Sequence, residues 1–260
     1  MSNGKLRVEC EGAIGYIVLE NLERRNAINA AMWRNMPAAI QQLVDDTGVR
    51  CIVLRGAGNM AFAAGADISE FEQQRASADS VKAYEHSIDA AHHAVETAAK
   101  PVIALIHGFC VGGGVALALS CDLRYCADNS QFAVPAARLG LGYGVRGHNR
   151  LVATVGHAAA REIMYSARRY SAQEAASIGL VNRVLPAAEL DKYVRKLAAD
   201  LAANAPLTMA TSKTIINTLI DPQGDFSEGN ELIARCMASE DYIEGRRAFM
   251  EKRKPQFKGK

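Results

Sequence analysis

The chain has 260 residues and a formal net charge of +2 at pH 7, with 49% hydrophobic and 22% charged residues. A chain of this length can bury a substantial core without disulfides or metals. The small net charge provides no broad basic surface for nucleic acid. No apolar run reaches the roughly 18 residues of a membrane span, and residues 1–8 are polar, without a signal core. We therefore expect a cytoplasmic protein without a nucleic-acid or membrane partner.

The cysteines and histidines show no metal-binding pattern. The cysteines are Cys10, Cys51, Cys110, Cys121, Cys126 and Cys236, and none forms a CxxC pair. Most lie in apolar runs, which predicts buried free thiols. His92 and His93 are adjacent, so on a helix they point in different directions and cannot form a two-ligand site with each other. We expect no metal.

The first 145 residues predict alternating strands and helices. Strands are expected at 6–10, 14–20, 51–54, 101–106 and 122–126, and helices at 30–44, 80–99 and 112–120. The run 51–54 is entirely apolar, which is typical of a buried parallel strand. The alternating order predicts an α/β fold with parallel strand pairing.

After about residue 145 helical patterns dominate. Helices are expected at 158–166, 172–178, 187–203, 207–219 and 227–249. Ser171 and Glu174 stand in capping-box register at the start of one of them, and Gly179 is suited to end it. We therefore expect an α/β core over residues 1–200 and a helical region over 201–260.

Two glycine-containing segments indicate a binding site. They span residues 61–68 (AFAAGADI) and 107–114 (HGFCVGGG), and each follows a strand-like run and opens a helix-like run. Free backbone N–H groups at a helix start can donate to a negative oxygen, and glycine allows a ligand to approach the backbone. Neither segment is a Walker loop or a dinucleotide fingerprint. The alternative is a tight turn with close helix packing.

These segments belong to a longer set of motifs. The set comprises residues 24–29 (RRNAIN), 63–68, 111–114, 121–123, 178–182, 240–242, 244–245 and 249–253. In this combination the chain resembles the crotonase (enoyl-CoA hydratase/isomerase) superfamily over nearly its whole length. The resemblance implies a spiral of ββα units and a helical C-terminal trimerisation region. It also implies a lyase of fatty acid metabolism that acts on acyl-CoA as a homotrimer or a dimer of trimers, without a tightly bound cofactor.

The family's oxyanion hole corresponds to the backbone N–H groups of Ala66 and Gly113. These groups are expected to bind the thioester oxygen as it becomes an enolate. The residues that match the family's coenzyme A contacts are Arg24, Arg25, Ala27, Ala64, Ile68, Gly112, Phe249 and Lys252. Lys252 corresponds to a lysine that reaches the coenzyme A phosphates, often from a neighbouring subunit; the alternative is a solvated charge in a basic tail. Asp67 is expected to support its loop.

The pattern breaks at the two glutamates with which a hydratase holds and activates water. Their positions are occupied here by Ala116 and Ala136. Alanine can neither accept a proton nor orient a water molecule. Because general acid–base catalysis contributes roughly 100- to 10,000-fold, we expect efficient hydration to be lost.

A third segment, residues 139–144 (LGLGYG), suggests another reaction. It resembles the segment of methylmalonyl-CoA decarboxylases in which a tyrosine, here Tyr143, orients the departing carboxylate. Arg138, Arg146 and His148 are close in sequence and are candidates for holding an acid group. That decarboxylase, however, has histidine at the position of Ala66, proline at Gly142 and glutamate at Ala116. The alternatives are that Tyr143 lines the acyl pocket and that Arg146 and His148 lie at a surface or interface.

Three interpretations therefore stay open. The first is a hydratase-like lyase by family, and the second a malonyl-type acyl-CoA decarboxylase that uses Tyr143. Loss of carbon dioxide produces the enolate directly, so no base has to remove a proton. This reaction therefore suits a site without the two glutamates. The third is a non-catalytic acyl-CoA binding protein.

Overall fold

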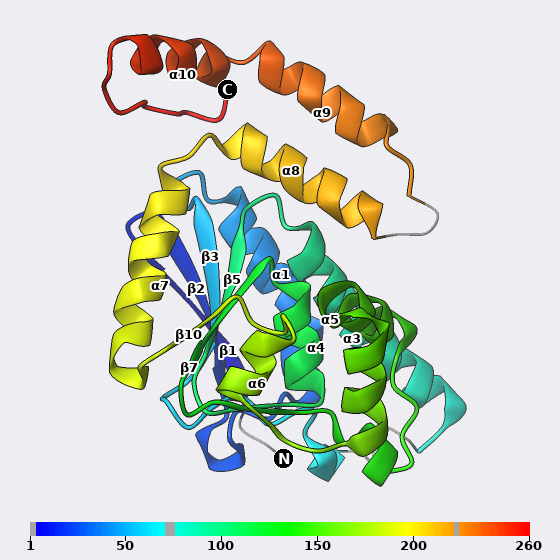
Figure 1. The fold of residues 1–260 in the computed structure, drawn as a ribbon. Helices are drawn as coiled ribbons and strands as arrows, with labels where there is room; N and C mark the ends of the chain where they lie inside the picture. The colour runs from blue at the N-terminus through cyan, green and yellow to red at the C-terminus, as the bar shows by residue number, and fades with distance from the viewer. Residues whose placement is uncertain (1–3, 71–75, 221–223) are drawn as a thin grey trace.

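The computed structural model describes residues 4–70, 76–220 and 224–260, so the first three residues of the polar N-terminal segment lie outside it. Its larger sheet contains β1 (Lys5–Glu11), β2 (Ile14–Glu20), β3 (Cys51–Gly56), β5 (Val102–Ile106), β7 (Leu123–Ala127) and β10 (Arg183–Leu185), in that order. Only β1 and β2 pair antiparallel; the other neighbours are parallel. The predicted α/β fold with parallel pairing is confirmed (Figure 1).

Both faces of this sheet are covered, which explains the continuous apolar runs in its central strands. Cys51 and Val53 pack with residues of α7 (Ala187–Ala202) in one core cluster. Ile52 and Leu54 belong to the other cluster, together with residues of α1 (Ala30–Asp45), α3 (Ala78–Thr97) and α4 (Gly113–Ser120). Alternate residues of one strand therefore supply the two cores.

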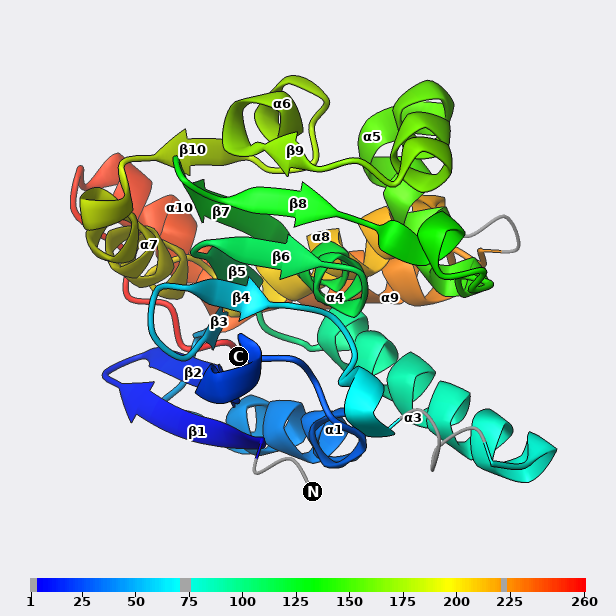
Figure 2. The same cartoon turned by 90° about the horizontal axis from the view of Figure 1, so that it is seen from below.

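The second sheet was missed in the sequence because its strands are very short. It contains β4 (Ala61–Ala63), β6 (Phe109–Val111), β8 (Gln131–Ala133) and β9 (Tyr170–Ser171), in that order. Each of β3, β5 and β7 is followed by a strand of this sheet and then by helical structure. This repeat is the expected ββα unit of the spiral. Figure 2 looks onto the second sheet, with α4 at its edge.

Several helix boundaries differ from the predictions. The expected helix at 158–166 is the end of α5 (Val145–Ser166), which is kinked at Gly156, where φ is +74°. The expected helix at 227–249 is two helices, α9 (Ser227–Met237) and α10 (Glu240–Met250). Ser239 separates them, because its side chain accepts from the N–H of Tyr242 and so starts a new helix.

The remaining helical elements complete the chain. They are η1 (Leu22–Arg24), η2 (Ile68–Glu70), η3 (Pro135–Arg138), α6 (Ala172–Ser177) and α8 (Pro206–Leu219). The capping box between Ser171 and Glu174 is present at the start of α6, and Gly179 follows that helix with φ of +77°. Figures 1 and 2 together place α8, α9 and α10 at the end of the larger sheet's strands opposite to β4 and β6.

The cysteines match their expected burial in part. All six cysteines are free, and Cys51, Cys110, Cys121 and Cys126 are buried, but Cys10 is exposed on β1. Within the described ranges, no group of three or more metal-ligating side chains could hold a metal ion. No helix in the described part of the chain is long and apolar enough to cross a membrane.

Candidate active site

The loop after β4 is fixed by backbone hydrogen bonds to the segment 21–29. The N–H of Ile28 donates to the carbonyl of Gly65 at 2.8 Å, and the N–H of Asp67 donates to the carbonyl of Ile28 at 2.9 Å. These bonds flank Ala66, which forms a parallel bridge with Ile28. Because successive N–H groups of an extended chain point in opposite directions, the N–H of Ala66 points away from Ile28. Gly65 allows this turn with φ of +103°.

Polar side chains also hold the loop after β4 and the segment 21–29 together. The buried carboxylate of Asp67 accepts hydrogen bonds from Arg24 Nη1 at 2.8 Å and from Ser69 Oγ at 2.7 Å. The buried Asn26 donates from Nδ2 to the carbonyls of Ala57 and Ala61 at 3.0 and 2.7 Å. Asp67 thus has the contacts of a loop-supporting residue. The anchoring bonds of Asn26 were not anticipated, because they join residues more than 30 positions apart.

Gly112 and Gly113 form the facing loop. Gly112 adopts φ of +52° and ψ of −114° and donates its N–H to the carbonyl of Ala133 at 2.8 Å. Gly113 then begins α4. A Cβ atom placed on Gly113 would lie 3.5 Å from the nitrogen of Ala66 and 3.3 Å from Cζ2 of Trp33. Gly113 therefore lies directly against Ala66 on one side and the indole of Trp33 on another.

Two backbone donors meet between these loops. Among the described residues, the N–H groups of Ala66 and Gly113 have no hydrogen-bond acceptor, and both residues are partly exposed. As the first residue of α4, Gly113 has no acceptor within its own helix and lies at the positive end of the helix dipole. The two donors have the arrangement of an oxyanion hole, in which both N–H groups bind one developing negative oxygen.

The residues predicted to contact coenzyme A fall into two groups. The first surrounds the loops: Arg24, Arg25, Ala27, Ala64, Ile68 and Gly112 all lie in segments joined by the bonds above. Arg25 is exposed, with its guanidinium 4.7 Å from the ring centre of Phe109. Ile68 is 70% exposed although it is apolar.

The second group is not brought to the loops within one chain. Phe249 lies on α10, and Lys252 is the second residue after it, at the end of the larger sheet's strands opposite to the loops. Phe249 is 83% exposed, and Lys252 is exposed as well.

Both positions of the missing glutamates lie beside the glycine loop. Ala116 is in the first turn of α4, where its N–H donates to the carbonyl of Gly112 at 3.2 Å. Ala136 follows Pro135, whose Cδ lies 3.9 Å from the Cβ position of Gly112. Both alanines are buried. The two positions therefore provide buried methyl groups beside the glycine loop and no carboxylate.

Tyr143 also reaches the glycine loop. Its hydroxyl donates to the carbonyl of Gly112 at 3.3 Å, and its ring meets His148 edge-on at 5.4 Å between centres. Burial raises the pKa of Tyr143 above its usual value, with a smaller contribution from Cys110. Tyr143 is thus a neutral hydrogen-bond donor at physiological pH. Its acceptor, Gly112, is the residue before Gly113.

The charged residues near Tyr143 have other partners. Arg146 pairs with the buried Glu96, with 2.6 Å between Nη1 and Oε2. His148 is exposed, and its Nδ1 lies 3.1 Å from the carbonyl of Gly144. Arg138 is exposed. The guanidinium of Arg146 is therefore already bound to a carboxylate.

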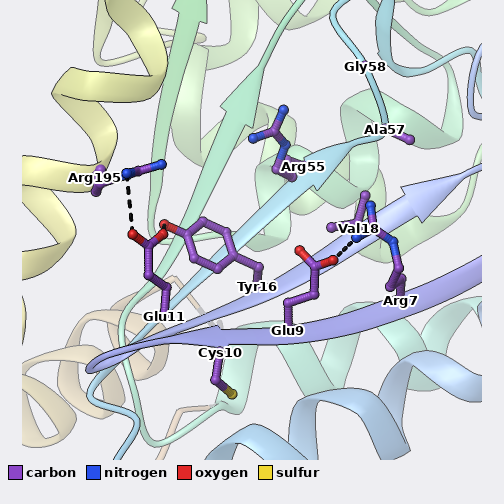
Figure 3. A pocket seen from close by; sticks show the side chains of 10 residues that line it. All are labelled: Arg7, Glu9, Cys10, Glu11, Tyr16, Val18, Arg55, Ala57, Gly58 and Arg195. Atoms are coloured by element: carbon purple, nitrogen blue, oxygen red, sulfur yellow. Dashed lines mark hydrogen bonds and ion pairs between the residues drawn. The ribbon is translucent and has the colours of Figure 1, made fainter.

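A pocket of about 550 Å³ lies elsewhere, over β1, β2 and β3 (Figure 3). Its lining includes the ion pairs Arg7–Glu9 and Arg195–Glu11. None of the predicted site residues lines it. Because its charged side chains already have ion-pair partners, it is a less suitable acyl-CoA site than the two loops.

Comparison with known proteins agrees with this geometry. Residues 9–260 match the family model described as enoyl-CoA hydratase/isomerase. The chain is 33% identical to the short-chain-enoyl-CoA hydratase of Clostridium acetobutylicum over 95% of each chain. It is also 33% identical to the crotonyl-CoA hydratase of Syntrophomonas wolfei over 99% of each chain. A crystal structure of an enoyl-CoA hydratase/carnithine racemase from Magnetospirillum magneticum superposes with a TM-score of 0.93 at 38% identity, covering 98% of this chain and 96% of that one. The chain belongs to the enoyl-CoA hydratase/isomerase family, the crotonase superfamily.

Proposed function

We propose that the protein binds an acyl-CoA thioester and stabilises its enolate with the N–H groups of Ala66 and Gly113. The observation that carries this proposal is the pair of partly exposed, unpartnered donors at the start of α4. A donor aimed at the developing oxyanion is worth about 100- to 1,000-fold in rate. Coenzyme A enters as part of the substrate, and enolate stabilisation by two amides requires no tightly bound cofactor.

Hydration of an enoyl-CoA is not the reaction that this site supports best. Ala116 and Ala136 are buried beside Gly112 and provide no acid or base. The buried carboxylates of Asp67, in the loop, and of Glu96, at the other end of α4, are bound to Arg24 and Arg146. Relatives named as hydratases support acyl-CoA as the substrate class, while these alanines argue for a different reaction within the family.

Decarboxylation of a malonyl-type acyl-CoA is the second candidate. In this reaction the bond between the α-carbon and the carboxylate breaks, and its electron pair forms the enolate whose oxygen the two amides bind. Carbon dioxide leaves, and a proton from solvent then reaches the α-carbon. The neutral hydroxyl of Tyr143 favours this candidate. In the structure it donates to the carbonyl of Gly112, and rotation of its O–H bond would turn that single proton to the carboxylate of a bound substrate and orient it.

A third candidate is acyl-CoA binding without turnover. The same experiment separates all three: the purified protein is tested for crotonyl-CoA hydration, for carbon dioxide release from methylmalonyl-CoA and for acyl-CoA affinity by calorimetry. We expect carbon dioxide release that Tyr143→Phe reduces, and hydration far slower than in a glutamate-containing relative. Affinity without any turnover would support the third candidate. Rapid hydration by rigorously purified protein would refute the role given to the two alanines.

The C-terminal residues complete the proposal. We place Phe249 and Lys252 in the site of a neighbouring subunit of a homotrimer, because both are exposed and distant from the loops of their own chain. Large apolar side chains exposed on α8 to α10 support such an assembly. They are Ile216, Leu219, Ile233, Met237, Ile243, Phe249 and Met250.

A further inference from the structure

Glu96 is a buried carboxylate that the proposed chemistry does not use. It lies in the last turn of α3, is 2% exposed, and pairs with two arginines. Arg146 Nη1 lies 2.6 Å from Oε2, and Arg150 Nε lies 3.0 Å from Oε1. Burying a charge is costly unless it is paired and hydrogen-bonded. Because each carboxylate oxygen has an arginine partner, the positions of Glu96, Arg146 and Arg150 relative to one another are tightly fixed.

The carboxylate connects the helices around the candidate site. Arg146 and Arg150 are four residues apart on α5, so they project from one face of its first turns. Ser120, the last residue of α4, donates from Oγ to Oε1 at 3.4 Å. The backbone carbonyl of Glu96 accepts from Asn217 of α8 at 2.9 Å. One residue therefore ties the start of α5 to α3, α4 and α8.

The start of α5 carries Tyr143. Gly144 is the N-cap of α5, so Tyr143 precedes the helix directly. Its ring lies on Gly147, where an added Cβ would come within 2.6 Å of Cε1. The position of the ring therefore follows the position of this helical turn. Arg146, in the same turn, is bound to Glu96.

We propose that Glu96 is a positioning residue that keeps the hydroxyl of Tyr143 against the carbonyl of Gly112 by fixing α5 through Arg146 and Arg150. The same carboxylate contacts the end of α4, the helix whose first residue is the oxyanion donor Gly113. It thus fixes both sides of the Tyr143–Gly112 contact. The positioning of Tyr143 by Glu96 does not depend on the proposed function; only its expected effect on substrate binding does.

The test measures Tyr143 itself, without substrate. In protein labelled with ¹³Cζ-tyrosine, the Tyr143 resonance is assigned by its absence in Tyr143→Phe. Glu96→Gln keeps the shape of the side chain and removes its charge. We expect it to shift or broaden the Tyr143 resonance and to leave Tyr125, which packs in the α7 core cluster, unchanged. Because this readout needs no ligand, its failure is distinct from failure of the proposed function.

Two further variants control the interpretation. Arg146→Gln removes the more exposed partner, 40% accessible, and leaves Arg150 on Glu96, so it serves if Glu96→Gln does not fold. Glu162→Gln removes an exposed carboxylate of α5 itself, which pairs with Arg168, and we expect no change at Tyr143. An unmoved Tyr143 resonance in a folded Glu96→Gln or Arg146→Gln protein would overturn the proposal.

A double-mutant cycle extends the test to ligand binding. Residues of one network commonly couple by roughly 2- to 100-fold. We expect Glu96→Gln to weaken malonyl-type acyl-CoA binding in the wild-type background and to have little effect when Tyr143→Phe is already present. Equal losses in both backgrounds would show that Glu96 acts on overall stability and not through Tyr143.

Discussion

At the scale of single residues, the candidate site depends on a glycine and on two alanines that carry no charge. Gly113 leaves open the space beside the Ala66 nitrogen, and Ala116 and Ala136 leave the site without carboxylates. That these alanines stand at the glutamate positions of a hydratase stays a prediction, which rests on motifs close to them in the sequence. The partners of Arg24 and Arg146 could not be read from the sequence, because Asp67 and Glu96 lie 43 and 50 residues away.

His92 provides a residue-scale prediction about pH. Burial lowers the pKa of His92 from 6.5 to about 4, although the Coulombic effects of Glu96 and Asp89 oppose this and that of Arg146 adds to it. Between pH 6.5 and 4 the unfolded chain therefore binds a proton at His92 and the folded protein does not. The contribution of neutral His92 to the free energy of unfolding is fully present above pH 6.5 and decreases as the pH falls towards 4. At up to about 1.4 kcal/mol per pH unit, the loss is readily measured by urea unfolding.

The matched control is the neighbouring histidine. His93 is exposed while His92 is buried, as expected for adjacent positions of a helix. We expect His92→Gln to flatten the decline in unfolding free energy between pH 6.5 and 4, and His93→Gln to leave it unchanged. An unaltered pH profile in the His92 variant would contradict the role of burial.

At the scale of elements, the second sheet and α4 are what bring the two loops together. The long apolar strands of the first sheet were predicted, since their cores on both faces produce continuous hydrophobic runs. The strands β4, β6 and β8 were not, because three residues are too few to show a period of two. The start of α5 was also missed, because Gly140, Gly142 and Gly144 precede it and suggest a loop.

The contact between α4 and β4 yields a prediction. A Cβ on Gly114 would lie 2.5 Å from the backbone oxygen of Ala63, so Gly114→Ala must separate the helix from the strand. Overpacking of this kind costs about 1–3 kcal/mol, which chemical unfolding would detect. Gly142→Ala is the control, since it has no neighbouring atom within 4 Å and its φ is not positive. Equal stability of the two variants would show that α4 moves freely.

At the scale of the whole molecule, the sequence predicted the fold and the family. The motif residues 249–253 suggested a part in the coenzyme A site, with Lys252 corresponding to a lysine that often reaches it from a neighbouring subunit. In the structure α10 lies far from the loops of its own chain (Figure 1), so the site that these residues reach stays a prediction. The division into residues 1–200 and 201–260 stays a prediction. A sequence pattern identifies an apolar helix face without identifying the chain that covers it.

The C-terminal helices α8 to α10 lead to a prediction about assembly and binding. We expect sedimentation equilibrium to give a trimer or hexamer, because the exposed apolar side chains of α8 to α10 need cover. Lys252→Ala should weaken affinity for coenzyme A, since an ammonium contact with phosphate is lost, while Lys254→Ala should have little effect. A monomeric protein whose affinity is insensitive to Lys252 would contradict the shared site.

The central claim is that Ala66 and Gly113 polarise a thioester carbonyl, and its vibrational frequency reports this directly. Difference infrared spectroscopy with an acyl-CoA labelled with ¹³C at the thioester carbon would isolate that stretch in the bound state. We predict a shift to lower frequency in the wild type, where two N–H groups draw charge to the oxygen. The shift should be absent or much reduced in Gly113→Ala, whose methyl would lie 3.5 Å from the Ala66 nitrogen. A bound thioester with the frequency it has in water, or the same shift in Gly113→Ala, would contradict the account.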